Sequence, residues 1–164
     1  MLSNVLLMLT ICATGCAVVP EALSESDIAA FLSSHNQLRS SLSLPDLVWN
    51  STLASVAEEH GSKCLWRHSF NRYGENLYAG SPKTTDNAEI ANAAVALWAT
   101  EVKKVDPKWA CIFVSQGTCG HYSQLVWKNT KQVGCSVIHC TRSLENLVVC
   151  EYDPPGNYMG QTPY

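Results

Sequence analysis

The 164-residue sequence contains eight cysteines but no Cys-x-x-Cys pair. This absence excludes the common zinc-finger and thioredoxin-like motifs. A His-Glu-x-x-His helix and a Gly-x-Ser-x-Gly turn are also missing, so the usual signatures of zinc proteases and serine hydrolases do not occur. Basic residues are sparse: the formal net charge is −3, and Lys103-Lys104 is the longest Lys/Arg run. Nucleic acid and anionic membrane surfaces are therefore poor partners.

The first twenty residues lack charge altogether. A short apolar stretch in residues 5–12 precedes small residues that include Gly15 and Ala17. This stretch is too short to span a bilayer. Residues 1–17 are therefore predicted to be a secretory signal peptide that is cleaved after Ala17. The alternatives are an apolar terminal helix and a bacterial lipoprotein signal in which Cys16 is lipidated.

Removal of that signal would leave six cysteines, an even number suited to three disulfides in an oxidising compartment. They are Cys64, Cys111, Cys119, Cys135, Cys140 and Cys150. The sequence itself leaves their pairing open, because six cysteines permit fifteen connectivities. Secretion and cysteine content together predict an extracellular protein with structural disulfides. Asn50-Ser51-Thr52 is an N-glycosylation sequon, although Asn50 could equally cap the helix that follows it.

Local patterns predict helices in the first part of the chain and strands in the last. Ser24 and Asp27 fit a capping box, and apolar residues then recur at helical spacing to about Ser40. Further helices are predicted over Thr52–Ser62 and from Asn87 to about Lys104. Three segments rich in β-branched and aromatic residues are predicted to be antiparallel strands: Tyr122–Trp127, Gln132–Cys140 and Asn146–Tyr152. Helices followed by strands, without repeats or linkers, indicate one α+β domain.

Several motifs occur in a fixed order along residues 24–164. They are His35-Asn36-Gln37-Leu38-Arg39, Trp49, His68-Ser69, Gly74-Glu75-Asn76-Leu77-Tyr78, Trp98-x-x-Glu101, Gly120–Thr130 and Cys150–Tyr158. On these motifs the chain is identified as a member of the CAP superfamily of cysteine-rich secretory, antigen five and plant pathogenesis-related type 1 proteins. It is most similar to the last group. Glu151 departs from the pattern, because relatives usually carry Asn or another neutral or basic polar residue there.

The resemblance implies a three-layer α-β-α sandwich with an antiparallel sheet, stapled by three disulfides. The implied pairs are Cys64–Cys140, Cys111–Cys119 and Cys135–Cys150. A monomer is expected.

A cleft lined by two histidines and two glutamates is also implied. They are His68, Glu75, Glu101 and His121. In such a cleft the two imidazoles could bind Zn²⁺. Glu75 or Glu101 could then act as the base of a metal-dependent hydrolase. Alternatively, the four side chains form a structural hydrogen-bonded network that requires no cofactor.

Two further segments carry functional expectations from the resemblance. Several family members bind sterols through an aromatic loop that here corresponds to Val105–Gly117. Its Trp109, Ile112 and Phe113 could contact a sterol or related lipid, or could be buried instead. Residues 154–164 resemble a tail that plant relatives release as a defence signalling peptide, although a tail that turns and packs onto the sheet is equally consistent with the sequence.

The leading hypothesis is a secreted protein that binds sterol or lipid in defence or host interaction. The sequence does not identify an extracellular protein or receptor partner. A metal-dependent hydrolase and a precursor of the C-terminal peptide are the alternatives.

Overall fold

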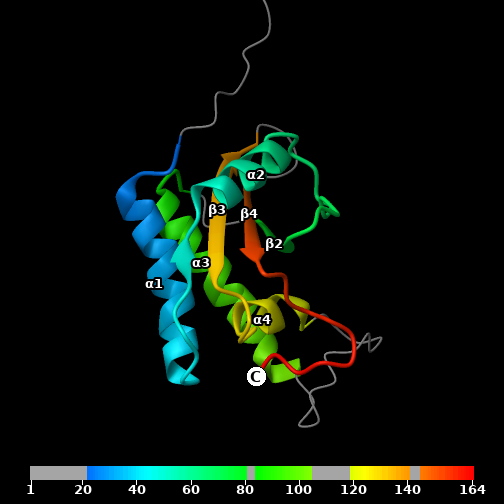
Figure 1. Cartoon of the computed structure of the whole chain (residues 1–164). Helices are drawn as coiled ribbons and strands as arrows, with labels where there is room; N and C mark the ends of the chain where they lie inside the picture. Colours follow the sequence, from blue (N-terminus) through cyan, green and yellow to red (C-terminus); the bar gives the residue numbers. More distant parts are fainter. Residues whose placement is uncertain (1–21, 81–83, 105–118, 141–144) are drawn as a thin grey trace, which may run out of the picture.

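The computed structural model describes residues 22–80, 84–104, 119–140 and 145–164 (Figure 1). The predicted signal peptide, Cys111 and the three apolar residues of the predicted lipid loop lie outside these ranges. The described helices are α1 (Glu25–Ser41), α2 (Ser51–Gly61), α3 (Asn87–Ala99), the 3-10 helix η1 (Thr100–Lys104) and α4 (Gly120–Leu125). The strands are β1 (Val48–Trp49), β2 (Gly74–Ala79), β3 (Gln132–His139) and β4 (Asn146–Asp153).

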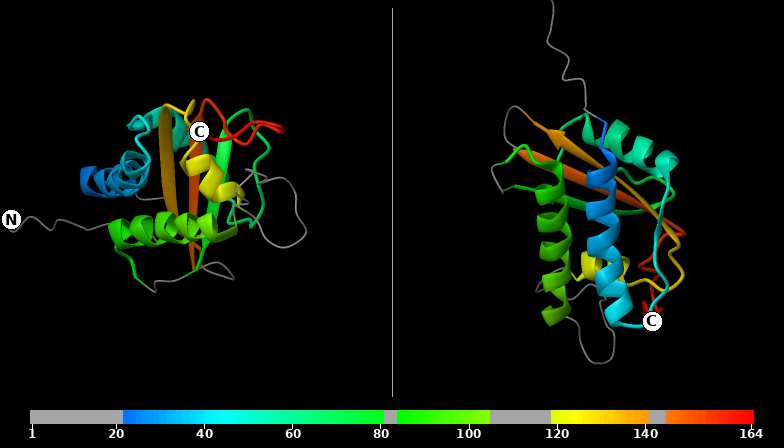
Figure 2. Two further views of the ribbon diagram at one scale, coloured as in Figure 1. Left: turned by 90° about the horizontal axis from the view of Figure 1, so that it is seen from below. Right: turned by 90° about the vertical axis from the view of Figure 1, so that its left-hand side faces the viewer.

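The strands form one sheet in the order β1-β3-β4-β2. Pairing is antiparallel between β3 and β4 and between β4 and β2. The predicted α-β-α sandwich is confirmed, with α1 and α3 side by side on one face of the sheet and α2 on the other (Figure 2). The short β1 differs from the expected antiparallel arrangement, since it pairs with β3 in parallel. Parallel pairing is possible here because a long stretch of chain separates the two strands.

Successive side chains of β3 point to opposite faces of the sheet and so contribute to two separate apolar layers of the core. Val133, Cys135 and Val137 pack in the layer shared with α1, α3 and α4, whereas Ile138 packs in the layer under α2. Gly134 lies where α2 approaches β3 closely. A Cβ at this position would collide with the backbone of the first turn of α2, so only glycine permits the contact.

The predicted helix starts are confirmed by their caps. The Ser24 side chain accepts a hydrogen bond from the backbone of Asp27, whose carboxylate accepts one from the Ser24 N–H in return, which completes the capping box. Asn50 caps α2 by accepting hydrogen bonds from the N–H groups of Thr52 and Leu53, at 2.8 and 3.3 Å. Its glycosylation stays a prediction. The third helix ends earlier than predicted, at Ala99, and continues to Lys104 as a 3-10 helix.

The prediction of a strand over Tyr122–Trp127 is wrong, because this region contains α4. The remote carboxylate of Glu101 accepts hydrogen bonds from the backbone N–H groups of His121 and Tyr122, at 3.0 and 3.2 Å. These are among the N–H groups that a helix start leaves without partners. A tertiary contact therefore stabilises helix in a segment whose residues locally favour strand.

Two of the implied disulfides are confirmed. Cys64–Cys140 joins the segment after α2 to the residue after β3, and Cys135–Cys150 joins directly opposed residues of β3 and β4. Cys119 is also disulfide-bonded. None of the helices in the described ranges is long and apolar enough to cross a membrane.

The C-terminal tail packs against the connection around α4. Lys128 donates its backbone N–H to the Pro163 carbonyl at 2.7 Å, and Gly156 donates to Gln124 Oε1 at 2.8 Å. The Tyr158 ring contacts that of Trp127. Release of residues 154–164 as a peptide stays a prediction.

Candidate functional site

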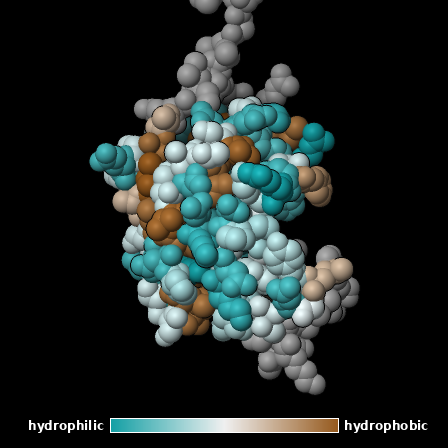
Figure 3. Space-filling view, in the orientation of Figure 1, coloured by the Kyte–Doolittle hydropathy of each residue, from teal (hydrophilic) through white to brown (hydrophobic). Residues whose placement is uncertain are grey.

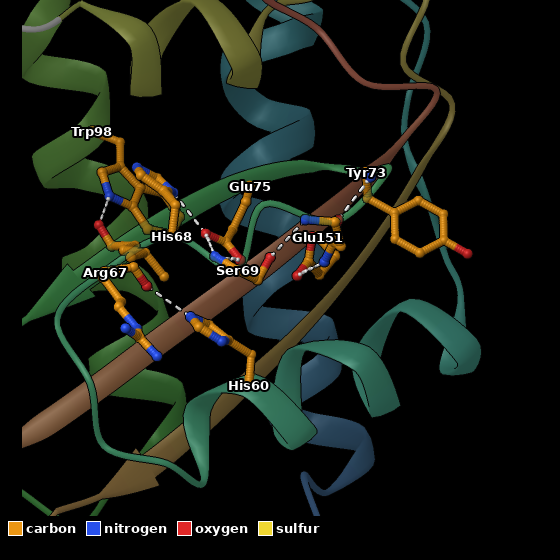
Figure 4. Close-up of polar contacts among 10 residues, drawn as sticks. His60, Arg67, His68, Ser69, Tyr73, Glu75, Trp98 and Glu151 are labelled. Carbon is orange, nitrogen blue, oxygen red and sulfur yellow. Dashed lines mark hydrogen bonds and ion pairs between the residues drawn. The ribbon is translucent and has the colours of Figure 1, made fainter.

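His68 and Glu75 form the first of two His–Glu pairs (Figure 4). The loop between α2 and β2 is fixed near His68 by a 2.7 Å hydrogen bond between His60 Nε2 and the Arg67 carbonyl. His68 Nδ1 lies 2.6 Å from Glu75 Oε1, and the Ser69 N–H donates to the same carboxylate. The hydrogen bond to Glu75 raises the pKa of His68. Burial disfavours ionisation of Glu75, but hydrogen bonds from His68 and Ser69 outweigh burial and lower its pKa.

His121 and Glu101 form the second pair. His121 Nδ1 lies 2.8 Å from Glu101 Oε1, while Glu101 Oε2 holds the first turn of α4. Burial opposes ionisation of Glu101, yet hydrogen bonds from His121 and from the α4 backbone lower its pKa. The Trp98 ring stacks on His121 with centroids 6.0 Å apart, and its Nε1 donates to the Leu77 carbonyl at 2.9 Å. The Trp98 bond is drawn in Figure 4.

The two pairs meet at β2. Asn76, next to Glu75 in this strand, donates its side-chain N–H to the His121 carbonyl at 3.1 Å. The four predicted side chains are thus arranged as two carboxylate–imidazole pairs connected through the Glu75–Asn76 backbone. Within the described ranges, no three His, Cys, Asp or Glu side chains are grouped so that they could hold a metal ion.

The imidazole nitrogens that the two pairs leave free are chemically suited to bind zinc. Each imidazole uses Nδ1 to bond a carboxylate, and within the described part of the chain no hydrogen bond reaches Nε2 of His68 or His121. Histidines that ligate a metal through one ring nitrogen commonly donate the other N–H to a carboxylate. Each of these imidazoles therefore has the donor chemistry of a zinc ligand.

Glu151 lies beside the first pair, directly opposite Glu75 in the β2–β4 register. Glu151 is fully buried, and the Asn71 side chain donates a hydrogen bond to Glu151 Oε1 at 2.8 Å (Figure 4). Oε2 has no hydrogen-bond partner among the described residues. Burial raises the pKa of Glu151 to about 8, the Asn71 bond opposes this rise, and the negative charge of Glu75 adds to it. Glu151 is therefore mostly protonated at pH 7 beside an ionised Glu75.

Sequence reasoning did not assign a role to Asn71 or Asn76. Asn76 lies within the quoted Gly74–Tyr78 motif, and its position directly after the predicted cleft residue Glu75 is the signal that could have identified it. Its amide also lies 3.4 Å from the Tyr152 hydroxyl, which in turn lies 2.9 Å from His35 Nε2. Burial lowers the pKa of His35 to about 4, so this fully buried histidine is neutral at pH 7.

Sequence comparison places the chain among known proteins. The family model described as "CAP: Cysteine-rich secretory protein family" matches residues 32–152. Pathogenesis-related protein 1A of Nicotiana tabacum is 36% identical over 138 residues, which cover 82% of this chain and 79% of the relative. Pathogenesis-related protein 1 of Arabidopsis thaliana is 33% identical over 155 residues, with 92% and 89% coverage.

Solved structures share the same architecture. The crystal structure of Na-ASP-1 is similar with a TM-score of 0.79 and 29% identity, over 92% of this chain and 44% of that chain. This chain thus spans less than half of Na-ASP-1. The crystal structure titled "NaASP2 with Zn2+" has a TM-score of 0.76 and 27% identity, over 92% of this chain and 90% of that one.

Proposed function

Because the chain belongs to the cysteine-rich secretory protein family, CAP, we propose that it is a secreted protein that binds a sterol or related lipid outside the cell. The names of its pathogenesis-related relatives support a role in defence or host interaction. The disulfides support an oxidising compartment, since such bonds persist mainly in secreted proteins.

One observation carries the lipid proposal: the predicted lipid loop is bounded in sequence by the second His–Glu pair. The loop follows η1, which carries Glu101, and precedes α4, which carries His121. These two side chains lie 2.8 Å apart, so the described elements that precede and follow the loop in sequence are joined at this pair. In this proposal Trp109, Ile112 or Phe113 contacts the apolar part of the sterol, and the sterol hydroxyl bonds polar groups of the adjoining pair.

A titration with a fluorescent sterol tests this proposal. The oxidised, signal-free protein is expected to bind saturably, and replacement of Trp109 or Phe113 by Ala is expected to weaken binding at least about tenfold. Trp66→Ala is the matched control, because Trp66 is an aromatic residue of another loop and is 58% exposed. The absence of saturable binding, or equal losses in Trp109→Ala and Trp66→Ala, would contradict the proposal.

The free Nε2 atoms favour a second candidate, zinc binding by His68 and His121. A bound Zn²⁺ would supply Lewis acidity and could activate a water molecule. Glu75 and Glu101 would orient the two imidazoles through their Nδ1 atoms. Calorimetry should show that His68→Ala and His121→Ala each reduce zinc affinity, whereas His139→Ala does not, because His139 bonds Asn146 elsewhere in the sheet. Equal affinity in all four proteins would rule out this site.

A further inference from the structure

We propose that the open edge of β3 binds an extended peptide that carries a positively charged side chain. This site lies away from the His–Glu pairs, because β3 meets the short β1 on its open side while β2 forms the opposite border of the sheet. The inference is therefore independent of the lipid and zinc proposals.

The backbone of β3 is only partly paired on the β1 side. β1 pairs with Gln132 and Val133 of β3, and it ends just before α2 begins. The Asn50 N–H donates to the Val133 carbonyl at 2.9 Å, so Val133 faces β1. Alternate residues of a strand direct their peptide groups to the same side, and Cys135 and Val137 therefore face the open edge.

The peptide groups of these two residues are buried but unpaired. Cys135 and Val137 are only 1% and 4% exposed. In the described part of the chain, no hydrogen bond reaches their N–H or C=O groups on this edge. Buried backbone groups in native proteins are nearly always paired with protein, ligand or ordered water. This edge therefore presents donors and acceptors that have no partner among residues 22–80, 84–104, 119–140 and 145–164.

A cavity of about 190 Å³ opens onto this edge. This volume corresponds to roughly six water molecules, enough space for part of a peptide chain. Leu23, Ile28 and Trp49 line its apolar side, and hydrophobic side chains gather between the starts of α1 and α2 (Figure 3). Ser136 also lines the cavity, and its buried hydroxyl has no hydrogen-bond partner among the described residues.

The unpaired edge favours an extended peptide as the ligand. N–H and C=O groups that alternate along a strand are complementary to another extended backbone, as in other proteins that bind a peptide by strand addition. Cys135 to Val137 spans about 7 Å, which matches two or three peptide residues. The apolar wall formed by Leu23 and Ile28 suits an aliphatic side chain at one of these positions.

Glu58 of α2 adds a charge preference. It lines the cavity, and no described basic residue forms an ion pair with it, whereas the adjacent Glu59 lies 3.7 Å from Lys63. An unpaired carboxylate at the rim of an apolar cavity favours a cationic group on the ligand. A Lys or Arg side chain next to an aliphatic residue meets both requirements.

Amide hydrogen exchange and titration of the full-length protein test the proposal with the peptide acetyl-Val-Lys-Val-Lys-amide. In the free protein, the Val137 amide should exchange faster than the amides of Ser136 and Ile138, which face β4. Saturating peptide should slow Val137 exchange at least about tenfold, because a new hydrogen bond forms. A peptide N-methylated at its central amides should not bind, since it lacks the donors for strand pairing.

Two matched variants test the charge preference. Glu58→Gln should weaken peptide binding about fivefold, as expected for loss of one charged contact. Glu59→Gln should bind like the wild type. Both changes conserve side-chain shape on exposed or half-buried positions, and an unchanged amide spectrum would establish that the fold is retained.

Three results would each overturn the proposal. The first is an absence of saturable binding, and the second is equal binding of the N-methylated peptide. The third is a Val137 amide that is already as protected as Ser136 in the free protein, which would mean that another segment of this chain or a second copy covers the edge.

Discussion

Glu151 is a buried carboxyl group whose protonation depends on its neighbours in the sheet. Its pKa is about 8 in the folded protein, against an ordinary value of 4.5. The folded state therefore retains a proton that the unfolded chain releases as pH rises above 4.5. Stability from this residue is fully present below that pH and is lost as pH rises through 8.

The variant Glu151→Gln should remove this pH dependence, because glutamine stays neutral. Relative to the wild type, the variant's free energy of unfolding should be larger at pH 8 than at pH 5 by about 3–4 kcal/mol. Denaturant unfolding at the two pH values measures the difference. Glu59→Gln, at a side chain that is 80% exposed, serves as the control. An equal effect of Glu151→Gln at both pH values would contradict the assigned protonation.

At the scale of elements, Arg39 holds α1 against the connection between α4 and β3. The residue is fully buried, and its guanidinium donates to the carbonyls of Leu125 and Trp127 at 2.9 and 3.0 Å. Further bonds reach the carbonyls of Pro45 and Thr130. A planar group with five N–H donors can bond several carbonyls at once, which a lysine ammonium cannot reproduce.

Arg39→Lys should therefore lower the free energy of unfolding by about 3 kcal/mol, because several buried carbonyls lose their donor. Thermal or denaturant unfolding measures this loss. Arg67→Lys is the matched control, since Arg67 is exposed. If both substitutions had the same small effect, the carbonyl contacts of Arg39 would not contribute to stability.

Helix α4 depends on a carboxylate from another element. Glu101→Ala removes the acceptor of the His121 and Tyr122 N–H groups. The variant should lose about 1–2 kcal/mol of stability, as expected for loss of a helix cap. Exchange of the two amides should accelerate. Val102→Ala alters an exposed neighbour in η1 and should leave their exchange unchanged. Unaltered exchange in Glu101→Ala would show that α4 does not need this cap.

At the scale of the whole molecule, the disulfides close loops of very different length. Cys64 and Cys140 are 76 residues apart, whereas Cys135 and Cys150 are 15 residues apart. In the chain-entropy model, a longer closed loop restricts the unfolded state more strongly. The first bond should therefore contribute more to stability.

Replacing both Cys64 and Cys140 by Ala should destabilise the fold by about 4.5 kcal/mol, against about 3 kcal/mol for the Cys135 and Cys150 pair. Denaturant unfolding of the two double variants gives the comparison. The Cys135 and Cys150 side chains lie in the core, so their replacement also tests packing. A larger loss in the second variant would show that core packing, and not loop length, decides the order.

The fold was largely predictable where local chemistry decides conformation. Ser24 and Asn50 start helices because their side chains accept bonds from the helix's own first turn. The β-branched and aromatic residues of β3 and β4 likewise indicated strands. β2 was not predicted as a strand, since Gly74, Glu75 and Asn76 have weak strand preference, and it forms because it pairs with β4.

The candidate site was predictable in its residues but not in its arrangement. The resemblance indicated His68, Glu75, Glu101 and His121, and the structure joins them as two separate His–Glu pairs. It also places the buried Glu151 opposite Glu75. The spacing of these residues along the chain does not predict which of them are in contact, because the contacts arise from strand register and from packing of α4.

The sequence by itself determined the helix caps, the strands β3 and β4 and the family motifs, because these depend on residues close together in the chain. Only the tertiary structure decided that Tyr122 belongs to a helix, that Glu151 keeps its proton and that β3 has an open edge among the described residues. The helix depends on Glu101, the proton depends on the burial of Glu151 and then on the charge of Glu75, and the edge depends on where β1 ends. These remote contacts outweigh local conformational preference because the groups are buried. An unpaired charge or peptide group in a buried position costs free energy.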